Sequence, residues 1–342
     1  MTIPVMPTGT ARRPVALFVL GMPRSGTSAL TRVLSLCGGA LPGQLELADS
    51  FNPRGYWEPR ETHHLNGRML RRHYSTDADP SLRLQEEGAL DVEEKTAFIE
   101  EVKAFLTTLP YSSLVVIKDL YITALSEMWF DAARQTGFDI AAVIALRHPQ
   151  EVIASVAASR RVSPELPNAL PSAMWLKYNL LAERNTRGMP RVFVEYANLL
   201  QDWRREVKRI SAALKINLAN RDECAVDNFL TKNLHRNRAY GPVAEPFGTD
   251  WVSTVYEVTQ SAARDEPWKE SALDRVYDAY RASEHAFRTA FNDFSEDFRD
   301  HMPPPNAVLL RLLPRRNVII ELRRRRGVRG VSVEVRRRGS VR

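Results

Sequence analysis

One stretch near the start of the chain constrains the fold most: a short apolar run, a glycine loop and a helical pattern in direct succession. The run Val15–Leu20 is apolar throughout and stops at Gly21. Beyond the loop, apolar residues recur at helical spacing, at Leu30, Val33, Leu34 and Cys37. A short continuous apolar run is typical of a strand buried on both faces of a parallel sheet. The stretch therefore predicts a strand, a turn and a helix.

The same alternation recurs along the chain. Further short apolar runs predict three more strands, at Leu114–Ile117, Ile140–Leu146 and Val192–Val194. Helical patterns lie between and after them, at Leu125–Gln135, Gln150–Ser159, Met174–Arg187 and Leu200–Leu214. Strands interleaved with helices indicate an α/β fold with a central parallel sheet and helices on both faces.

A length of 342 residues favours one large α/β domain with peripheral additions, which we expect to span residues 1–300. We expect residues 41–110 to form a helical excursion on the substrate side of this domain. Residues 41–91 have no strong period and predict one or two helices, and Val92–Leu106 predicts another. A late aromatic stripe at helical spacing predicts core packing, at Leu273, Val276, Tyr280, Phe287, Phe291 and Phe294. Met302–Pro305 then ends the helical region and opens a linker to the tail, residues 301–342.

The basic character of the chain is confined to its last residues. The net charge is +7, but Arg311–Arg342 holds twelve arginines and two glutamates, or +10, which leaves −3 for residues 1–310. The body is therefore slightly acidic, and we expect no nucleic-acid partner. An arginine-rich tail is typical of a solvated segment, and the alternative is peripheral contact with an anionic membrane surface or another polyanion.

Composition and cysteine usage predict a soluble protein of the cytoplasm, with the inner face of the membrane as a peripheral alternative. No apolar run approaches the roughly 18 residues of a membrane span. The apolar run before Gly21 has six residues, which is short for a signal peptide. The two cysteines, Cys37 and Cys224, have no metal-binding or disulfide spacing, so we expect both in the core.

The loop Gly21–Ser28, with sequence GMPRSGTS, lies where a strand meets a helix and predicts a phosphate site. It has the G-x-x-x-x-G frame of a Walker A loop, but Thr27 and Ser28 stand where a nucleotide triphosphatase has Lys and Ser/Thr. That lysine reaches the β- and γ-phosphates, and its neighbour holds Mg²⁺. The absence of this lysine favours a ligand that has no γ-phosphate and is bound without a metal ion. Arg24 would then be the cation at the reacting phosphate.

A second phosphate site is predicted after the third apolar strand. Arg147 follows that strand, and Ser155 lies on the helical stretch that comes next. The two side chains are within reach of one site, where a guanidinium and a hydroxyl could bind a phosphate by charge and hydrogen bonds. Two phosphate sites on one sheet suggest a nucleotide that is phosphorylated at both ends.

Several of these motifs together resemble sulfotransferases that use 3′-phosphoadenosine 5′-phosphosulfate (PAPS). The loop Pro23–Ser28 is similar to the PRSGT loop of tyrosylprotein sulfotransferases and of many bacterial family members, and the pair Arg147 and Ser155 matches the family's 3′-phosphate site. Three further segments resemble family motifs, at Asn52–Glu58 (NPRGYWE), Val194–Leu200 (VEYANLL) and Phe229–Arg236 (FLTKNLHR). The resemblance covers residues 15–240.

The resemblance implies a P-loop nucleotide-kinase-like fold, PAPS as donor, 3′-phosphoadenosine 5′-phosphate (PAP) as product, and no metal. It implies that the 5′ end is held by Arg24, Ser25, Gly26, Thr27 and Ser28. Arg147 and Ser155 would then bind the 3′-phosphate, and Tyr196 would border the nucleotide. Where many relatives have KDPR, this chain has KDLY at Lys118–Tyr121. A substrate role there and a surface pair of Lys118 with Asp119 remain alternatives.

Sulfuryl transfer also needs a general base that removes the acceptor's proton. By resemblance, Glu58 in the GYWE segment is the first candidate, with Arg24 as the second catalytic residue at the leaving group. The alternative bases are Glu46, Glu61, His63 and His64. The expected acceptor is a hydroxyl or amine of a carbohydrate or small metabolite, with a lipid-linked glycan and a tyrosyl peptide as alternatives. The sequence does not determine the oligomeric state.

Two other functions fit parts of the sequence. An ATP-dependent small-molecule kinase would use the same sheet, but it would require a lysine at Thr27 and Mg²⁺. A non-catalytic nucleotide-binding or scaffold protein would act through its basic tail. The presence of Arg24 together with Arg147 and Ser155 favours the enzyme.

Overall fold

A computed structural model of the chain describes residues 13–49, 52–158, 169–219, 221–230 and 242–301, together with 319–320 and 335–336. The chain divides into two compact units, Met1–His285 and Ala286–Arg342. The second unit contains the end of a helix and two short antiparallel strands, β5 (Ile319–Ile320) and β6 (Val335–Arg336). Most of the arginine-rich tail lies outside the described residues.

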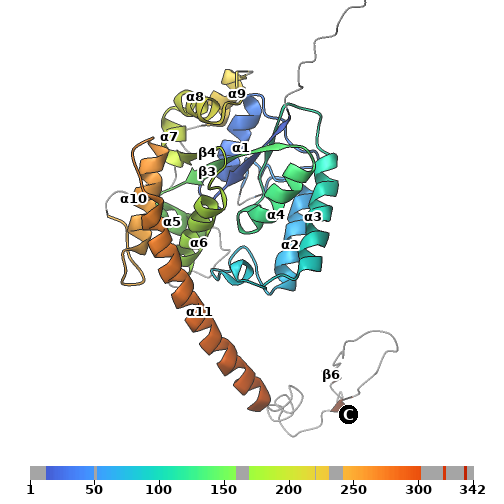
Figure 1. Cartoon of the computed structure of the whole chain (residues 1–342), viewed down its shortest axis with the longest axis vertical. Coiled ribbons are helices and arrows are strands. Elements are labelled where there is room, and N and C mark those ends of the chain that lie inside the picture. Colours follow the sequence, from blue (N-terminus) through green and yellow to red (C-terminus); the bar gives the residue numbers. More distant parts are fainter. Residues whose placement is uncertain are drawn as a thin grey trace, which may run out of the picture. The chain divides into compact units, whose positions relative to one another are not determined.

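The first unit is built on a parallel sheet of four strands (Figure 1). The strands are β1 (Val15–Leu20), β2 (Leu114–Ile117), β3 (Asp139–Leu146) and β4 (Arg191–Glu195), in the order β2-β1-β3-β4. Val15 lies opposite both Leu114 and Asp139, so β1 has β2 on one side and β3 on the other. All four strands occur where the apolar runs predicted them, and the α/β fold with a parallel sheet is confirmed.

Alternate residues of each strand enter two separate hydrophobic cores, because successive side chains in a strand point to opposite faces. In β1, Leu17 and Val19 belong to one core, whereas Ala16, Phe18 and Leu20 belong to the other. The first core is covered by α1 (Thr27–Leu36), α7 (Tyr196–Gln201), α8 (Trp203–Leu214) and α9 (Glu223–Phe229).

The second core is covered by a larger set of helices. These are α2 (Arg60–Arg72), α3 (Val92–Thr107), α4 (Ile122–Gln135), α5 (Pro149–Ala158), α6 (Ala169–Asn185), α10 (Trp251–Ala263) and the start of α11 (Glu270–His301). No helix within the described residues combines the length and the apolar character that crossing a membrane would require.

The long excursion leaves the sheet and returns to it at a single place. Ala40 follows α1 and pairs with Val115 of β2, donating its N–H to the carbonyl of Leu114 at 2.9 Å. Between these points lie α2, a short 3₁₀ turn η1 (Arg83–Gln85) and α3. The prediction of one or two helices in residues 41–91 and of another helix after them agrees with this arrangement.

Three sequence expectations need correction or fall outside the description. The helix predicted at Leu200–Leu214 is two helices, because Asp202 breaks the first and caps α8 by accepting a hydrogen bond from the Arg205 N–H at 3.0 Å. Cys37 is buried as expected, but Cys224 is exposed, because Val226 is the buried residue of α9. Of the aromatic stripe, Leu273, Val276 and Tyr280 are buried, and the side chains of Phe287, Phe291 and Phe294 are not described.

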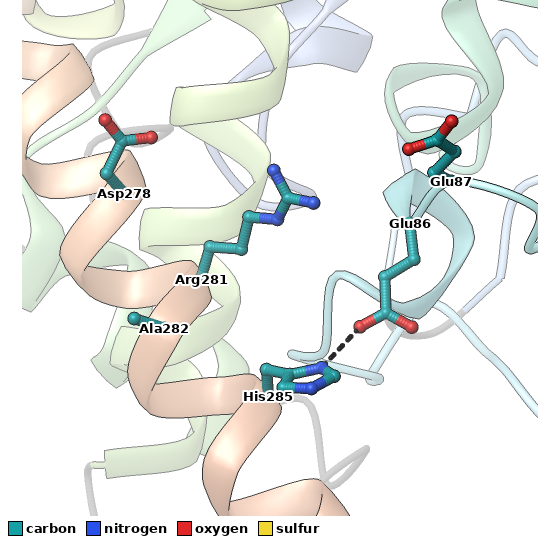
Figure 2. Close-up of a pocket in the computed structure, with 6 residues that line it drawn as sticks. All are labelled: Glu86, Glu87, Asp278, Arg281, Ala282 and His285. Atoms are coloured by element: carbon teal, nitrogen blue, oxygen red, sulfur yellow. Dashed lines mark hydrogen bonds and ion pairs between the residues drawn. The ribbon is translucent and has the colours of Figure 1, made fainter.

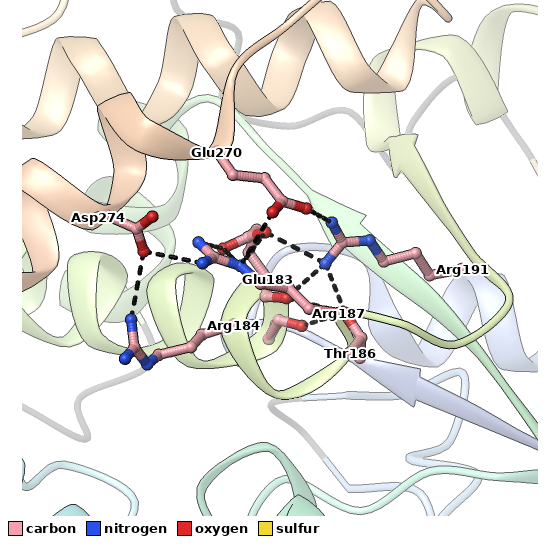
Figure 3. A network of polar contacts seen from close by, with 8 residues as sticks. Glu183, Arg184, Thr186, Arg187, Arg191, Glu270 and Asp274 are labelled. Carbon is pink, nitrogen blue, oxygen red and sulfur yellow. Dashed lines mark hydrogen bonds and ion pairs between the residues drawn. The ribbon is translucent and has the colours of Figure 1, made fainter.

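A buried carboxylate joins α6, β4 and the first turns of α11 (Figure 3). Glu183 is 1% exposed and accepts hydrogen bonds from Arg187, four residues on, with its closest contact at 2.7 Å. Arg191 at the start of β4 contacts Glu183 at 3.1 Å and Glu270 at 2.7 Å. Because a buried charge is costly unless it is paired, this network fixes the end of α6 against the edge strand.

Candidate functional site

The phosphate loop lies at the carboxyl end of β1 and leads directly into α1. Gly26 is the N-cap of α1, with a φ of 91°. Ser25 is fully buried, and its hydroxyl has no hydrogen-bond partner among the described residues. A buried hydroxyl without a partner carries a desolvation cost. It lies in a loop before a helix N-terminus, a position where anions bind readily.

The two predicted phosphate motifs meet at Arg24. The Nε of Arg24 donates to Oγ of Ser155 at 3.0 Å, although the two residues are 131 apart in the chain. Nη1 of Arg147 donates to the backbone carbonyl of Arg24, also at 3.0 Å. Since β1 and β3 are neighbours in the sheet, the loops after them lie side by side. The arrangement brings two guanidinium groups and two serine hydroxyls to the same edge of the sheet.

Arg147 is held in place from three directions. Its Nε donates to Oε2 of Glu151 at 2.8 Å, and its guanidinium lies 5.0 Å from the ring centre of Tyr196. Trp175 donates its Nε1–H to the carbonyl of Arg147 at 3.2 Å. These contacts fix the direction of the guanidinium, which is what bidentate binding of a phosphate needs.

Tyr196 at the start of α7 also contacts the phosphate loop. A Cβ added to Gly26 would lie 2.3 Å from the ring of Tyr196, a separation that no side chain can accept. Gly26 is therefore required both by its left-handed backbone and by the aromatic ring against it. The five predicted loop residues, Arg147, Ser155 and Tyr196 thus form one connected group.

Lys118 connects this group to Glu58. Lys118 lies at the carboxyl end of β2, and its Nζ is 3.3 Å from Oγ of Ser28 and 3.4 Å from the carbonyl of Tyr56. The same Nζ forms an ion pair with the carboxylate of Glu58. Lys118 and Asp119 are both buried, so the surface-pair alternative is wrong. The cause is the excursion, which folds over the end of β2 and covers both side chains.

Asp119 is a buried carboxylate with fixed partners. Its Oδ1 accepts from Nδ2 of Asn66 at 2.9 Å and from the backbone N–H of Tyr121 at 2.9 Å. Burial disfavours the charged form, and the nearby charge of Glu58 adds to this, so the pKa of Asp119 rises to about 7. Nδ1 of His63 lies 3.8 Å from a carboxylate oxygen of Asp119 and 3.8 Å from one of Glu58.

Comparison with known proteins decides the family. The sequence profile described as "Sulfotransferase family" matches residues 14–220, more than half of the chain. The chain belongs to the sulfotransferase family. No sequence among the curated proteins matches it.

Two solved structures are similar to this sulfotransferase. One is the sulfotransferase domain from the curacin biosynthetic pathway, with 13% identity, 76% of this chain and 100% of that chain covered, and a TM-score of 0.43. The other is the sulfotransferase domain from the olefin synthase of Synechococcus PCC 7002, with 18% identity, 80% of this chain and 96% of that chain covered, and a TM-score of 0.40.

The alternative bases lie at different distances from this centre. His63 contacts it, as described above, and has a side chain that is 34% exposed. Glu61 and His64 are exposed. Glu46 is close through its backbone, because its N–H donates to the carbonyl of Glu58 at 2.7 Å, but its carboxylate lies 4.0 Å from Nε of Arg60. Glu58 is the only one of the five that is buried.

The other family-like segments also approach the loop. Asn52 places its Nδ2 3.5 Å from Oγ of Ser28, and it donates to the carbonyl of Gly55 at 2.8 Å. The ring of Trp57 packs edge-on against Phe229, 6.4 Å between centres. The continuation of the Phe229 segment, residues 231–236, lies outside the described residues.

Glu58, His63 and Asp119 are the one group in the described part of the chain with the spacing of a cation site, since their ligand atoms lie within 4.8 Å of one another. The ammonium of Lys118 already supplies a positive charge to Glu58. The arrangement therefore fits a carboxylate neutralised by lysine better than a carboxylate that binds a metal ion.

Four residues of this site were not singled out from the sequence. Glu151, in the first turn of α5, could have been found as an acidic residue four positions after Arg147. Thr62, Asn66 and Trp175 gave no comparable signal, because their contacts depend on how α2 and α6 pack against the sheet.

A separate hollow of about 580 Å³ lies between α11 and the turn after η1 (Figure 2). It is lined by Glu86, Glu87, Asp278, Arg281, Ala282 and His285. His285 contacts Glu86 across it at 3.0 Å. None of the predicted site residues lines this hollow, and three acidic groups around one arginine do not form an anion site.

Proposed function

We propose that this sulfotransferase takes its sulfuryl group from PAPS and transfers it to a hydroxyl or amine of a carbohydrate or small metabolite. One observation carries the proposal: Arg24 of the phosphate loop contacts both Ser155 and Arg147. Two anion-binding motifs that are remote in sequence thus form one continuous surface. A nucleotide with phosphate groups at its 3′ and 5′ ends is the ligand that would engage both.

The residues present fit such a nucleotide. The loop offers backbone N–H groups, the guanidinium of Arg24 and the unpartnered hydroxyl of Ser25 to a 5′-phosphosulfate. Thr27 and Ser28 follow at the N-terminus of α1, where anions are favoured. Arg147 and Ser155 would hold the 3′-phosphate, with Tyr196 beside the nucleotide. Bound there, PAPS supplies a sulfuryl group and a good leaving group, so the chain needs no metal for the transfer.

The chain's own residues would then lower the barrier by position and charge, as in phosphoryl transfer. Arg24 and Lys118 carry positive charge toward the loop, where negative charge develops on the leaving oxygen. Glu58 would act as the general base that takes the acceptor's proton. Its ion pair with Lys118 holds the carboxylate in one orientation beside Ser28.

Ligand binding tests the donor and separates the sulfotransferase from an ATP-dependent kinase. Thermal unfolding should be measured with PAP in EDTA and, separately, with ATP and Mg²⁺. A ligand present at 100 times its Kd stabilises the folded state by about 2.7 kcal/mol. We expect stabilisation by PAP without Mg²⁺ and none by ATP. Stabilisation by ATP with Mg²⁺ alone would refute the proposal, and no response to either nucleotide would favour a scaffold protein.

The acceptor requires a screen, which we expect to yield a carbohydrate or a small metabolite. PAPS labelled with radioactive sulfur should be incubated with metabolite and glycan extracts and with the full chain. The Arg147→Ala variant is the matched control, because it removes a proposed donor contact and leaves the acceptor side unchanged. Label that appears only with the unaltered chain identifies the acceptor.

A further inference from the structure

The imidazole of His63 lies between two buried carboxylates and bonds to neither. Its Nδ1 is 3.8 Å from both Glu58 and Asp119, and this buried nitrogen has no hydrogen-bond partner among the described residues. The rest of the ring is partly exposed, with 34% of the side chain open to solvent. His63 is therefore the group through which a proton could pass between the buried carboxylates and water.

The hydrogen bonds around Asp119 indicate where a proton resides. The hydroxyl of Thr62 has one hydrogen, and it lies 2.9 Å from the carbonyl of Pro59, which can only accept. The same hydroxyl is 3.3 Å from Oδ2 of Asp119. If the hydrogen of Thr62 points to Pro59, the contact with Asp119 is a hydrogen bond only when Oδ2 carries a proton and donates it.

The other oxygen of Asp119 is an acceptor. Trp129 donates its Nε1–H to Oδ1 of Asn66 at 2.9 Å, which fixes the amide of Asn66 so that its NH₂ faces Asp119. The backbone N–H of Tyr121 donates to the same oxygen, Oδ1 of Asp119. A carboxyl group with one accepting oxygen and one protonated oxygen satisfies all of these contacts.

The charges facing Asp119 agree with this assignment. Glu58 contributes a negative charge from the segment before α2, and Lys118 a positive charge from the end of β2. His63 approaches from α2, and the phenols of Tyr121 and Tyr178 are neutral at pH 7 because burial raises the pKa of each. Without a proton on Asp119, the three groups Glu58, Lys118 and Asp119 would together carry one uncompensated negative charge, and with the proton these three are neutral.

We propose that Glu58, His63 and Asp119 form one proton-sharing group, in which Asp119 stores a proton on Oδ2 and releases it to water through His63 when Glu58 takes a proton from the acceptor. The proposal rests on the proposed role of Glu58 as base. Asp119 touches no substrate and is a positioning residue.

The steps balance in atoms, charge and electron pairs. The acceptor loses its proton to Glu58, its lone pair forms the new bond to sulfur, and the bond from sulfur to the phosphate oxygen breaks with its electron pair on that oxygen. The proton of Asp119 passes to His63 and then to water. One proton enters the buried group and one leaves it, so the net charge of the group stays the same during transfer. A proton that moves from Glu58 to Asp119 then restores the resting state.

The test follows Asp119 in the full chain by NMR, with ¹³C-labelled aspartate carboxyl groups and histidine rings, from pH 5 to 9. The variants Asp119→Asn and His63→Gln assign the two signals. We expect the carboxyl signal of Asp119 to move with a midpoint near pH 7. The His63 ring signal should show an inflection at the same pH, which disappears in Asp119→Asn. Glu58→Gln should lower the Asp119 midpoint, whereas the exposed neighbour Glu61→Gln should leave it unchanged.

Thr62→Val provides an independent reading that does not require a substituted carboxylate. If the hydroxyl accepts from protonated Asp119, its removal disfavours the protonated form and the Asp119 midpoint falls. If the hydroxyl donates to charged Asp119, the midpoint rises, and the proposal is wrong. The proposal is also wrong if the carboxyl signal shows that Asp119 is ionised throughout pH 5–9. It is equally wrong if the His63 signal shows no inflection at the Asp119 midpoint. These measurements need no PAPS, so their outcome is separate from PAP binding, which tests the donor.

Discussion

Lys118 and Glu58, which are 60 residues apart in the chain, form an ion pair in which neither side chain is more than 5% exposed. Removing one partner of a buried ion pair leaves an uncompensated charge, which costs about 3–5 kcal/mol. We therefore predict that Lys118→Met lowers the free energy of unfolding by about that amount, measured by urea denaturation followed through tryptophan fluorescence.

The matched control for Lys118→Met is Lys103→Met, because Lys103 pairs with Glu100 at 2.7 Å on the exposed surface of α3. Exposed pairs contribute about 0–1 kcal/mol, so this variant should unfold almost as the unaltered chain does. The double variant Lys118→Met/Glu58→Gln should recover part of the loss. If Lys118→Met and Lys103→Met changed the free energy of unfolding equally, the ion pair of Lys118 with Glu58 would not contribute to stability.

Glu58→Gln should separate binding from catalysis. The amide keeps the shape of the side chain but cannot take a proton, so turnover of PAPS with the acceptor from the screen should fall by about 10²–10⁴-fold. PAP should bind at least as tightly as to the unaltered chain, because Lys118 beside Ser28 is left without its carboxylate partner. Calorimetry and a radiolabel transfer assay give the two readings. Full turnover by Glu58→Gln would assign the base to another residue, and Glu46→Gln is the comparison variant on the same segment.

Arg147→Ala should weaken PAP binding, and because it leaves the buried carboxylate of Glu151 without its partner, it should also lower the free energy of unfolding. Hydrogen bonds to charged groups contribute about 1.5–3 kcal/mol, which corresponds to roughly 10- to 150-fold in Kd. Calorimetric titration with PAP measures this directly. Arg134→Ala removes an arginine that pairs with Asp131 on the surface of α4 and should bind PAP normally. An unchanged Kd for PAP in Arg147→Ala would show that Arg147 does not bind the 3′-phosphate.

Gly26→Ala should damage the phosphate loop through two effects that both come from the added Cβ. Its φ of 91° is unfavourable for alanine, at a cost of about 1–3 kcal/mol, and the methyl group would meet the ring of Tyr196. We expect lower stability in urea and weaker PAP binding. Gly43→Ala is the control, since nothing lies within 4 Å of its added Cβ. A Gly26→Ala chain as stable as Gly43→Ala would mean that the loop has a different conformation in solution.

The pKa of Asp119 predicts how stability depends on pH. Its value rises from 3.8 to about 7 in the folded chain, so the folded state holds more protons than the unfolded state between these limits. Stability contributed by this group is therefore present below pH 4 and lost as pH rises to 7. Urea denaturation at pH 5, 6, 7 and 8 should show the free energy of unfolding of the unaltered chain falling, relative to that of Asp119→Asn, from pH 5 to about pH 7. A stability of the unaltered chain that rises relative to Asp119→Asn over this range would contradict the raised pKa.

The strands and the phosphate loop could be read from sequence because their signals are local. A buried parallel strand needs a short apolar run, and the four runs coincide with β1 to β4. Helix starts were less accurate: α4 begins at Ile122 rather than Leu125, and α6 at Ala169 rather than Met174.

The burial of Lys118 and Asp119 could not be predicted from the local sequence. Whether the pair is buried depends on Thr62, Asn66 and Glu58, which belong to a segment about 60 residues earlier. Nothing in the local pattern around Lys118 shows that this segment returns to cover it. Burial of a polar pair by a remote helix is a property of tertiary packing, whereas Arg147 and Ser155 could be paired because they lie on consecutive elements.

The bridge between Ala40 and Val115 has a practical consequence for engineering. It pins the two ends of a 74-residue detour, Ala40 to Ser113, against one edge strand, while Glu58 and Asn66 of the detour contact the end of the same strand and α2 and α3 pack against the sheet. Lengthening a flexible turn costs little, about 0.6 kcal/mol for each doubling. The exposed turns of the detour can therefore vary in length between engineered forms, provided that a graft retains the carboxylate for Lys118 and the apolar faces of α2 and α3.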